Sequence, residues 1–174
     1  MADLNQQMQQ LKRGENSALV AIYESTKKSV FAIAFTILRD YATAEDVMQE
    51  TYLKIQSAAS QYNDGTNARA WIHAISRNLA FNIYKKRKQE CFVDFSEHDY
   101  IGGDYELKAN DESGIIQLTL KTLDENESGI VLMHTIGEIK LVEIAAILDK
   151  SSATVRWQYN NALKKLRKAI KEEQ

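Results

Sequence analysis

The sequence predicts an all-α protein of two small helical domains joined by an acidic flexible linker, with a helix-turn-helix in the C-terminal domain. Three observations predict this fold. The 174 residues include no proline and only 7 glycines, a composition that favours helices. Apolar residues recur at helical spacing on both sides of residues 90–112, where the helical period is lost. Residues 139–170 have the pattern of two helices around a tight turn.

The first part of the chain contains two amphipathic helical stretches. Residues 3–39 have apolar side chains at spacings of three and four, with an interruption near Gly14. A second helix is expected over residues 43–60, and Thr43 with Asp46 has the pattern of a capping box at its start.

A polar loop and a long basic helix follow. Residues 61–67 contain the turn signal Asp-Gly and are predicted to form a loop. Helical periodicity resumes at Ala68 and continues to about Lys88. The side chains expected to be buried in this helix are Trp71 or Ile72, Ile75, Leu79 and Ile83.

The segment of residues 90–112 has a different composition from its surroundings. It carries 8 acidic residues and 1 basic residue, and it contains a Gly-Gly pair. Such a segment lacks the apolar side chains that a packed core needs. We therefore predict an N-terminal domain over residues 1–89, a linker, and a C-terminal domain over residues 113–174.

Four helices are predicted in the C-terminal domain. The first covers residues 115–122, and Asp124 with Glu127 should cap the second, which ends near Ile136. The last two form the helix-turn-helix, over residues 141–148 and 152–171. Either Ser151 or Ser152 is the expected N-cap of the last helix. The side chains expected to point inward from the third are Val142, Ile144, Ala145 and Leu148.

Positive charge is concentrated in two stretches of the chain. Residues 69–89 and 150–171 hold 13 of the 22 Lys and Arg residues and no Asp or Glu, although the net charge is -2. Charge separated in this way predicts a polyanion bound at two places, because neutralised phosphates supply affinity without sequence specificity. The alternative is that both stretches are solvated helix faces.

Several functional classes are excluded by what the sequence lacks. The single cysteine, Cys91, rules out an intrachain disulfide and is typical of a reducing cytoplasm. No metal-ligand spacing, acid/base pair, nucleophile set or phosphate loop is visible, so we expect no metal, no cofactor and no enzymatic activity. No apolar run is long enough to span a membrane and no signal peptide is present, which indicates a soluble cytoplasmic protein.

The two basic helices carry different side chains on their outward faces. The helix over residues 68–88 combines aromatic rings, which could stack on unpaired bases, with cations that could follow phosphates. The alternative is that the rings are core residues. Its outward side chains are Arg77, Phe81, Tyr84 and Lys88, with Asn78, Asn82 and Lys85 beside them.

In the last helix, an apolar face would be buried and a polar face would point outward. Amides and cations on such a face are suited to base edges and phosphates in a major groove. Trp157 on this face could contact DNA, a partner protein or the other domain. The apolar face is Val155, Tyr159, Ala162, Leu166 and Ile170, and the outward face is Trp157, Asn160, Asn161, Lys164 and Lys168.

A further stripe lies on the second predicted helix. Asp46, Gln49, Glu50 and Leu53 are spaced to share one outward face. The stripe is either solvated surface or a docking face for a basic or amphipathic partner helix.

Taken in order, these segments resemble an extracytoplasmic-function (group 4) sigma factor of the bacterial sigma-70 family. Residues 44–55, which include Asp-Val-Met-Gln-Glu, are similar to the polymerase-docking helix of that family. Residues 68–88, which include Arg-Ala-Trp-Ile, are similar to its promoter-melting helix, and residues 139–167 to its second DNA-binding region. The likeness covers nearly all of the chain except the linker.

The resemblance implies promoter-specific transcription initiation with core RNA polymerase, and it implies roles for individual residues. The polymerase-binding set would be Asp46, Gln49, Glu50 and Leu53. The loop of residues 61–67 would hold a flipped base of the minus-ten element. The DNA-binding set on that side would be Tyr62, Asn63, Asp64, Arg77, Asn78, Phe81, Asn82, Tyr84, Lys85, Arg87 and Lys88. The set facing the minus-thirty-five element would be Thr154, Arg156, Trp157, Asn160, Asn161, Lys164, Lys165 and Lys168.

Some residues depart from the family pattern. Asp124 stands where proline is usual, and Asp149 stands at a turn where glycine is usual, although Asp tolerates left-handed geometry better than most residues. Asn82 replaces a common Asp. The last helix also has uncharged residues at positions that are often basic, so contact with the upstream element should be weaker or differently specific; these are Gln158, Asn161 and Leu163.

Three functional hypotheses follow from these observations. The first is a sigma factor, which would bind core RNA polymerase and promoter DNA and be held by an anti-sigma factor. The second is a stand-alone helix-turn-helix regulator that binds duplex DNA without polymerase. The third is a protein-interaction module, to which the exposed Trp157 would belong.

Overall fold

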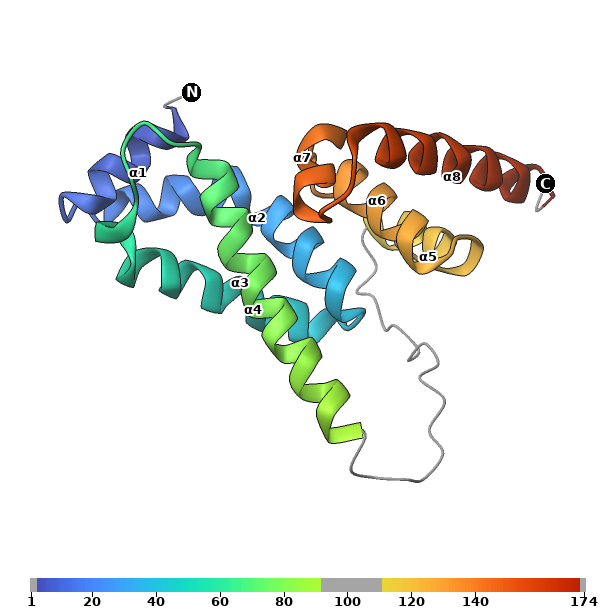
Figure 1. The fold of residues 1–174 in the computed structure, drawn as a ribbon, viewed down its shortest axis with the longest axis horizontal. Helices are drawn as coiled ribbons and strands as arrows, with labels where there is room; N and C mark the ends of the chain where they lie inside the picture. Colours follow the sequence, from blue (N-terminus) through green and yellow to red (C-terminus); the bar gives the residue numbers. More distant parts are fainter. Residues whose placement is uncertain (1–2, 92–110, 173–174) are drawn as a thin grey trace. The chain divides into compact units, whose positions relative to one another are not determined.

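The computed structural model describes residues 3–91 and 111–172, and every regular element in these two ranges is helical (Figure 1). The chain divides into two compact units, Met1–Gly103 and Asp104–Gln174. This division falls inside the predicted linker, residues 90–112, most of which lies outside the described residues. The all-α fold class is confirmed, and the domain boundaries within the linker stay a prediction.

In the described residues 3–91, the first unit consists of four α-helices and one short 3-10 helix. Helix α2 packs against α1, α3 and α4, so it forms the centre of the unit. The elements are α1 (Leu4–Lys12), α2 (Ser17–Leu38), α3 (Tyr41–Ser57), η1 (Ala59–Gln61) and α4 (Ala68–Cys91).

Local chemistry explains most of these boundaries. Gly14 has φ of +90° between α1 and α2, a conformation that glycine adopts without strain. Helix α3 begins two residues earlier than predicted, because its N-cap is Asp40 and not Thr43. The Asp40 Oδ1 atom accepts a hydrogen bond of 2.7 Å from the backbone N–H of Thr43.

The core of the first unit draws residues from all of its elements. Met8 and Leu11 of α1 belong to one buried cluster with Ile22 of α2, Ile55 of α3 and Ile72 of α4. Burial of this apolar surface is the main force that holds the helices together. The predicted choice between Trp71 and Ile72 is decided in favour of Ile72, which is fully buried, while Trp71 packs at the margin.

Polar side chains are buried between α2 and α4, on a face that the apolar pattern did not identify. His73 Nε2 lies 2.9 Å from Ser29 Oγ, and Ser76 Oγ donates to the Val30 carbonyl at 3.1 Å. Burial, assisted by the positive charge of Arg69, lowers the pKa of His73 from 6.5 to about 4. His73 is therefore neutral in the folded protein at neutral pH.

In the described residues 111–172 the second unit has four helices, and Asp124 is the N-cap of the second of them, α6, as predicted. Asp124 Oδ1 accepts a hydrogen bond of 2.9 Å from the backbone N–H of Glu127. Position 124, one of the departures from the family pattern noted in the sequence, is thus occupied by a residue that caps the helix. The helices are α5 (Asp111–Thr122), α6 (Glu125–Thr135), α7 (Leu141–Ile147) and α8 (Ser152–Glu172).

The turn between α7 and α8 has the predicted geometry. Asp149 has φ of +53°, in the left-handed region that its short polar side chain tolerates. Ser151, and not Ser152, caps α8, because its Oγ accepts the N–H of Thr154 at 3.1 Å. This tight connection is the turn of a helix-turn-helix.

The apolar face of α8 is buried as predicted along most of its length. Val155 and Ala162 are fully buried, and Tyr159 and Leu166 pack against Leu123 and Val131. Two positions differ from the prediction. Val142 on α7 is 59% exposed and Ile170 near the end of α8 is 45% exposed.

Within the two described ranges, no helix is both long and apolar enough to cross a membrane. The same residues contain no group of three His, Cys, Asp or Glu side chains that could hold a metal ion.

Candidate polymerase and nucleic-acid interfaces

The acidic stripe of α3, defined as Asp46, Gln49, Glu50 and Leu53, lies on the solvent side of the first unit. All four side chains are exposed, and Leu53 is 67% exposed. The opposite face of α3 buries Val47, Thr51 and Ile55 in the core, so the helical period directs the stripe outward. With two carboxylates beside an exposed leucine, the stripe combines negative charge and apolar surface, as a docking site for a basic, amphipathic helix would.

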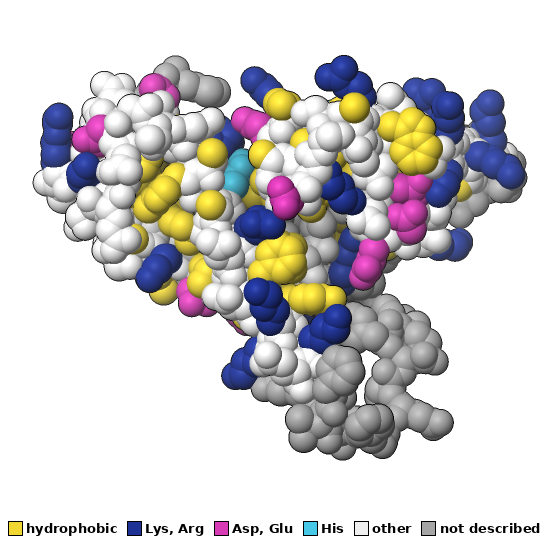
Figure 2. All heavy atoms as spheres, in the orientation of Figure 1, with side chains coloured by type: hydrophobic (Ala, Val, Ile, Leu, Met, Phe, Trp, Pro, Cys, Tyr) yellow, Lys and Arg dark blue, Asp and Glu magenta, His cyan; other side chains and the backbone are white. Residues whose placement is uncertain are grey.

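The outward face of α4 carries the predicted mixture of cations, amides and rings. Asn78, Asn82, Lys85 and Lys88 are exposed, and Tyr84 is an exposed aromatic side chain. Figure 2 shows dark blue cations around yellow hydrophobic side chains over the lower half of this helix. The arrangement offers a stacking surface next to positive charge, which suits unpaired nucleic acid.

Phe81 and Arg77 on this face interact with each other. The Arg77 guanidinium carbon lies 5.0 Å from the centroid of the Phe81 ring, in cation–π geometry. Both side chains are half-buried. One face of the Phe81 ring is therefore covered by a cation, and Arg77 holds its charge at the ring and not in free solvent.

Arg87 connects the basic face to the start of α3. Its Nη2 atom donates a hydrogen bond of 2.6 Å to Thr43 Oγ1. Hydrogen bonding from Thr43 lowers the pKa of Asp40, the N-cap of α3, and the positive charge of Arg87 contributes further. Arg87 is thus fixed by the first unit, unlike the exposed Lys85 and Lys88 on the same helix.

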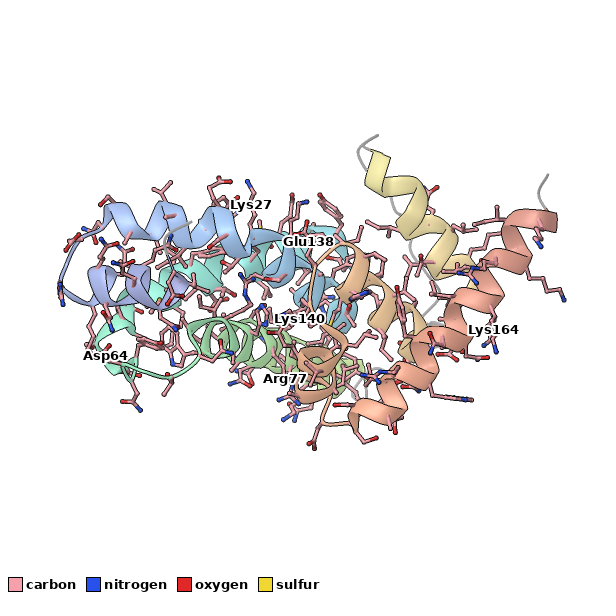
Figure 3. The ribbon with its side chains drawn as sticks, turned by 90° about the horizontal axis from the view of Figure 1, so that it is seen from above. Lys27, Asp64, Arg77, Glu138, Lys140 and Lys164 are labelled. Atoms are coloured by element: carbon pink, nitrogen blue, oxygen red, sulfur yellow. The ribbon has the colours of Figure 1, made fainter. Side chains whose placement is uncertain are left out.

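The loop predicted over residues 61–67 begins one residue later, because Gln61 ends η1, and it presents Asn63 and Asp64 to solvent but not Tyr62. Tyr62 is only 1% exposed, and its hydroxyl donates to the Thr66 carbonyl at 2.7 Å. The expectation that this ring is available to a flipped base is corrected: Tyr62 supports the loop from inside. Asp64, at the edge of the unit in Figure 3, lies 3.3 Å from Lys12 Nζ.

The outward face of α8 contains most of the residues predicted for duplex DNA. Thr154, Arg156, Asn160 and Lys164 are exposed, and Figure 3 shows Lys164 directed away from its helix. Trp157 is 67% exposed on the same surface. An α-helix that offers amide, guanidinium and ammonium groups on one face can enter a major groove.

Two of the predicted DNA-binding residues on α8 are committed to a buried carboxylate. Glu127 of α6 is 4% exposed. Asn161 Nδ2 donates to its Oε1 at 2.8 Å, and Lys165 Nζ lies 2.7 Å from its Oε2. The hydrogen bond to Glu127 raises the pKa of Lys165. Asn161 and Lys165 therefore attach α8 to α6.

Glu127 was identified in the sequence only as part of a capping pattern. Its carboxylate contacts α8 and not the N-terminus of α6. The two partners, Asn161 and Lys165, are 34 and 38 residues further along the sequence. The signal available in the sequence was a carboxylate three residues before the apolar run of residues 130–133, because a charge that becomes buried beside such a run requires a partner. The sequence alone did not reveal which cation that partner would be.

Comparison with known proteins gives a family for each unit. The model of sigma-70 region 2 matches residues 22–90, and the model of sigma-70 region 4 matches residues 119–168. Together the matches cover about two thirds of the chain. The first match includes α3, the loop and α4, and the second includes the helix-turn-helix.

Relatives and solved structures resemble the chain over nearly its whole length. It is 21% identical to the ECF RNA polymerase sigma factor SigW of Bacillus subtilis, over 97% of each chain. It is 25% identical to SigK of Mycobacterium ulcerans, over 97% of this chain and 94% of that one.

Two solved structures share the fold. CnrH, in complex with the cytosolic domain of CnrY, has a TM-score of 0.67 at 18% identity and covers 99% of this chain and 100% of its own. RpoE of Bartonella quintana, in complex with the anti-sigma factor NepR, has a TM-score of 0.61 at 19% identity, covering 87% and 96%. The chain belongs to the sigma-70 family of RNA polymerase sigma factors, in the extracytoplasmic-function class.

Proposed function

We propose that this protein binds core RNA polymerase, directs it to a specific class of promoters and helps to open the duplex there. One observation supports the proposal above all others. The acidic stripe of α3 is exposed, and the outward faces of α4 and α8 each carry exposed polar and charged side chains beside an exposed aromatic ring. A sigma factor needs three such surfaces in this order, for polymerase, the minus-ten element and the minus-thirty-five element.

The division of labour follows the chemistry of each surface. Asp46, Gln49, Glu50 and Leu53 would dock on polymerase. Asn63, Asp64 and the face of α4 would hold the minus-ten strand, where stacking and phosphate contacts act together. The face of α8 would enter the major groove of the minus-thirty-five element. In this scheme the protein is cytoplasmic and has no catalytic activity of its own, and an anti-sigma factor would cover some of these surfaces.

A stand-alone helix-turn-helix regulator is less well supported. Such a regulator would use α7 and α8 on duplex DNA. It would leave the acidic stripe of α3 and the exposed Tyr84 of α4 without a role.

Run-off transcription with purified bacterial core polymerase on a promoter library tests the proposal. We expect new transcripts that share a start-site motif when this protein is added. Absence of transcripts, together with no co-elution of the protein with core polymerase from its own host, would favour the stand-alone regulator.

The face of α4 should act in strand opening more than in initial binding. We expect Phe81→Ala to reduce open-complex formation by about 5- to 150-fold, since stacking on one base contributes roughly 1–3 kcal/mol, and we expect Lys85→Ala to reduce it through loss of a phosphate contact. Affinity for the closed duplex should change much less. Permanganate footprinting measures the open complex, and electrophoretic mobility shift at low temperature measures the closed complex.

Lys86→Ala is the matched control for Lys85→Ala. Lys86 is exposed on the same helix and carries the same charge as Lys85, but it lies outside the predicted DNA-binding set. Equal losses in opening and in closed-complex binding for Phe81→Ala would contradict a role in melting.

The adjacent lysines of α8 should behave differently from each other. Lys164 is exposed and has no hydrogen bond or ion pair within the described part of the chain. We expect Lys164→Met to reduce the slope of log binding constant against log salt concentration by about 1, the value for one phosphate contact. The melting temperature should not change. Lys165→Met should instead lower the melting temperature by several degrees, because it removes the cation that faces the buried Glu127 carboxylate.

The double variant Glu127→Gln/Lys165→Met separates the two effects. A neutral amide at position 127 no longer needs a cationic partner and can still accept the hydrogen bond from Asn161. The melting temperature should therefore recover relative to Lys165→Met alone. Thermal unfolding followed by circular dichroism, and DNA binding over a salt series, measure both quantities; identical behaviour of the two single variants would refute the distinction.

A further inference from the structure

The loop of residues 61–67 is held in place by α1, a helix that lies outside the segment matched by the region 2 model, residues 22–90. We propose that Asn5 and Lys12 of α1 are positioning residues that determine how strictly this loop discriminates among bases of the minus-ten element. The inference rests on the proposed function, in which the loop receives a base from the opened strand.

Lys12 fixes the first half of the loop. Its Nζ atom donates a hydrogen bond of 2.9 Å to the carbonyl of Tyr62 and lies 3.3 Å from Asp64 Oδ2. The two acceptors are 50 and 52 residues away in the sequence. A charged donor forms stronger hydrogen bonds than a neutral one. Lys12 therefore sets both the backbone at Tyr62 and the direction of the Asp64 carboxylate.

Asn5 fixes the second half of the loop and the start of α4. Its Oδ1 atom accepts a hydrogen bond of 2.9 Å from the backbone N–H of Ala68, the first residue of α4. The same oxygen lies 3.2 Å from the hydroxyl of Tyr62, which donates to the Thr66 carbonyl at 2.7 Å. Asn5 thus supplies, from another helix, an acceptor for one of the free N–H groups at a helix start.

An open cavity lies where α1 meets the loop. Its volume is about 900 Å³, and its lining includes Asn5 and Gln7 of α1 together with Gly65, Thr66 and Asn67. Helix α1 therefore lines this cavity together with the second half of the loop, which Asn5 also helps to hold. A polar site discriminates between ligands only when its groups are held within a few tenths of an ångström.

The consequence is specific to base selection. If α1 releases the loop, the cations of α4 still attract phosphates, and α3 still presents its acidic stripe. What is lost is the fixed position of the loop's polar groups relative to an incoming base. Discrimination should therefore fall further than overall activity.

The test is run-off transcription by core polymerase with the full-length protein, on templates randomised across the minus-ten element. The readout is the ratio of transcripts from the best and the worst base at each position. For Asn5→Ala and for Lys12→Met we expect this ratio to fall by about tenfold at one position, as the loss of one base-reading contact would give. Ratios at the other positions should stay as in the unmodified protein.

Conservative variants provide the controls. Asn5→Asp keeps an oxygen acceptor next to the N-terminus of α4, where negative charge is favourable. Lys12→Arg keeps a cationic donor. Both variants should retain discrimination. Arg13→Met should retain it too, because it removes the charge of the exposed C-cap residue of α1, next to Lys12. Circular dichroism reports whether each variant is folded.

The outcomes separate this inference from the proposed function. If Asn5→Ala and Lys12→Met lower transcription equally for every base and leave the ratios unchanged, α1 is only a structural support and the inference is overturned. If Asn5→Ala does not fold, Lys12→Met decides the question, because Lys12 lies at the exposed rim of the unit. If the unmodified protein gives no polymerase-dependent transcript, the proposed function itself has failed.

Discussion

Replacement of Asp46 and Glu50 together by lysine is expected to weaken binding to core RNA polymerase by about 100-fold or more. The two carboxylates are exposed one helical turn apart on α3. Lysine at both positions would place positive charge against a basic partner surface, and juxtaposed like charges cost several kcal/mol. The helix should persist, because lysine is a good helix former and neither side chain is buried.

Fluorescence anisotropy of labelled protein titrated with core polymerase measures this effect. The single variant Glu50→Lys should be compared with Glu15→Lys, which makes the same charge change at an exposed position of the first unit outside α3. Glu15→Lys should bind normally. Unchanged affinity of the Asp46/Glu50 double variant, with helicity intact, would refute the assignment of α3 as the docking helix.

The first unit is expected to lose stability on mild acidification because of His73. Burial lowers the pKa of this residue to about 4 in the folded protein, against an ordinary value of 6.5. Between these two values the unfolded chain binds a proton that the folded protein does not. Stability therefore falls as the pH falls from about 6.5 to about 4, and the free energy of unfolding should decrease by roughly 3 kcal/mol over this window.

Urea unfolding at a series of pH values tests this prediction. Trp71 lies in the first unit and Trp157 in the second, so a Trp157→Phe background lets tryptophan fluorescence report on the first unit alone. His73→Gln should flatten the dependence on pH between 6.5 and 4, because an amide does not titrate.

His134→Gln serves as the control for general acid effects. His134 belongs to α6 of the second unit, where its Nδ1 lies 2.8 Å from the Ile139 carbonyl. The unfolding of the first unit should keep its full pH dependence in this variant. If the free energy of unfolding depends on pH equally in His73→Gln and in the unmodified protein, another group causes the acid sensitivity.

Much of the candidate site could be predicted from the sequence because its surfaces belong to single helices. The acidic stripe of α3 and the outward faces of α4 and α8 follow from the 100° rotation per residue of a helix. Charge patterning likewise located the two cationic stretches without any tertiary information. For the same reason, the exposed positions of Glu50, Lys85 and Asn160 agree with the sequence-based expectation.

The structure added contacts that the sequence had not predicted where a side chain had a partner that helical periodicity does not encode. Tyr62, in a polar loop, was expected to be accessible, but it is buried among core residues of the first unit. Asn161 and Lys165 were assigned to DNA, but both bind Glu127. In each case a contact across the fold decided the environment of a residue whose sequence neighbours gave no indication of it.

The sequence by itself determined the all-α class, the cap at Asp124 and the left-handed turn at Asp149, and it indicated the family of the chain, but it left the cap of α8 open between Ser151 and Ser152. These features depend on interactions within a few residues, so local composition is sufficient to specify them. Only the tertiary structure decided which polar groups serve the fold and which remain free to bind. Asn5, Lys12, His73 and Glu127 meet their partners across 34 to 63 residues of sequence. Such contacts form only when hydrophobic burial has brought the helices together.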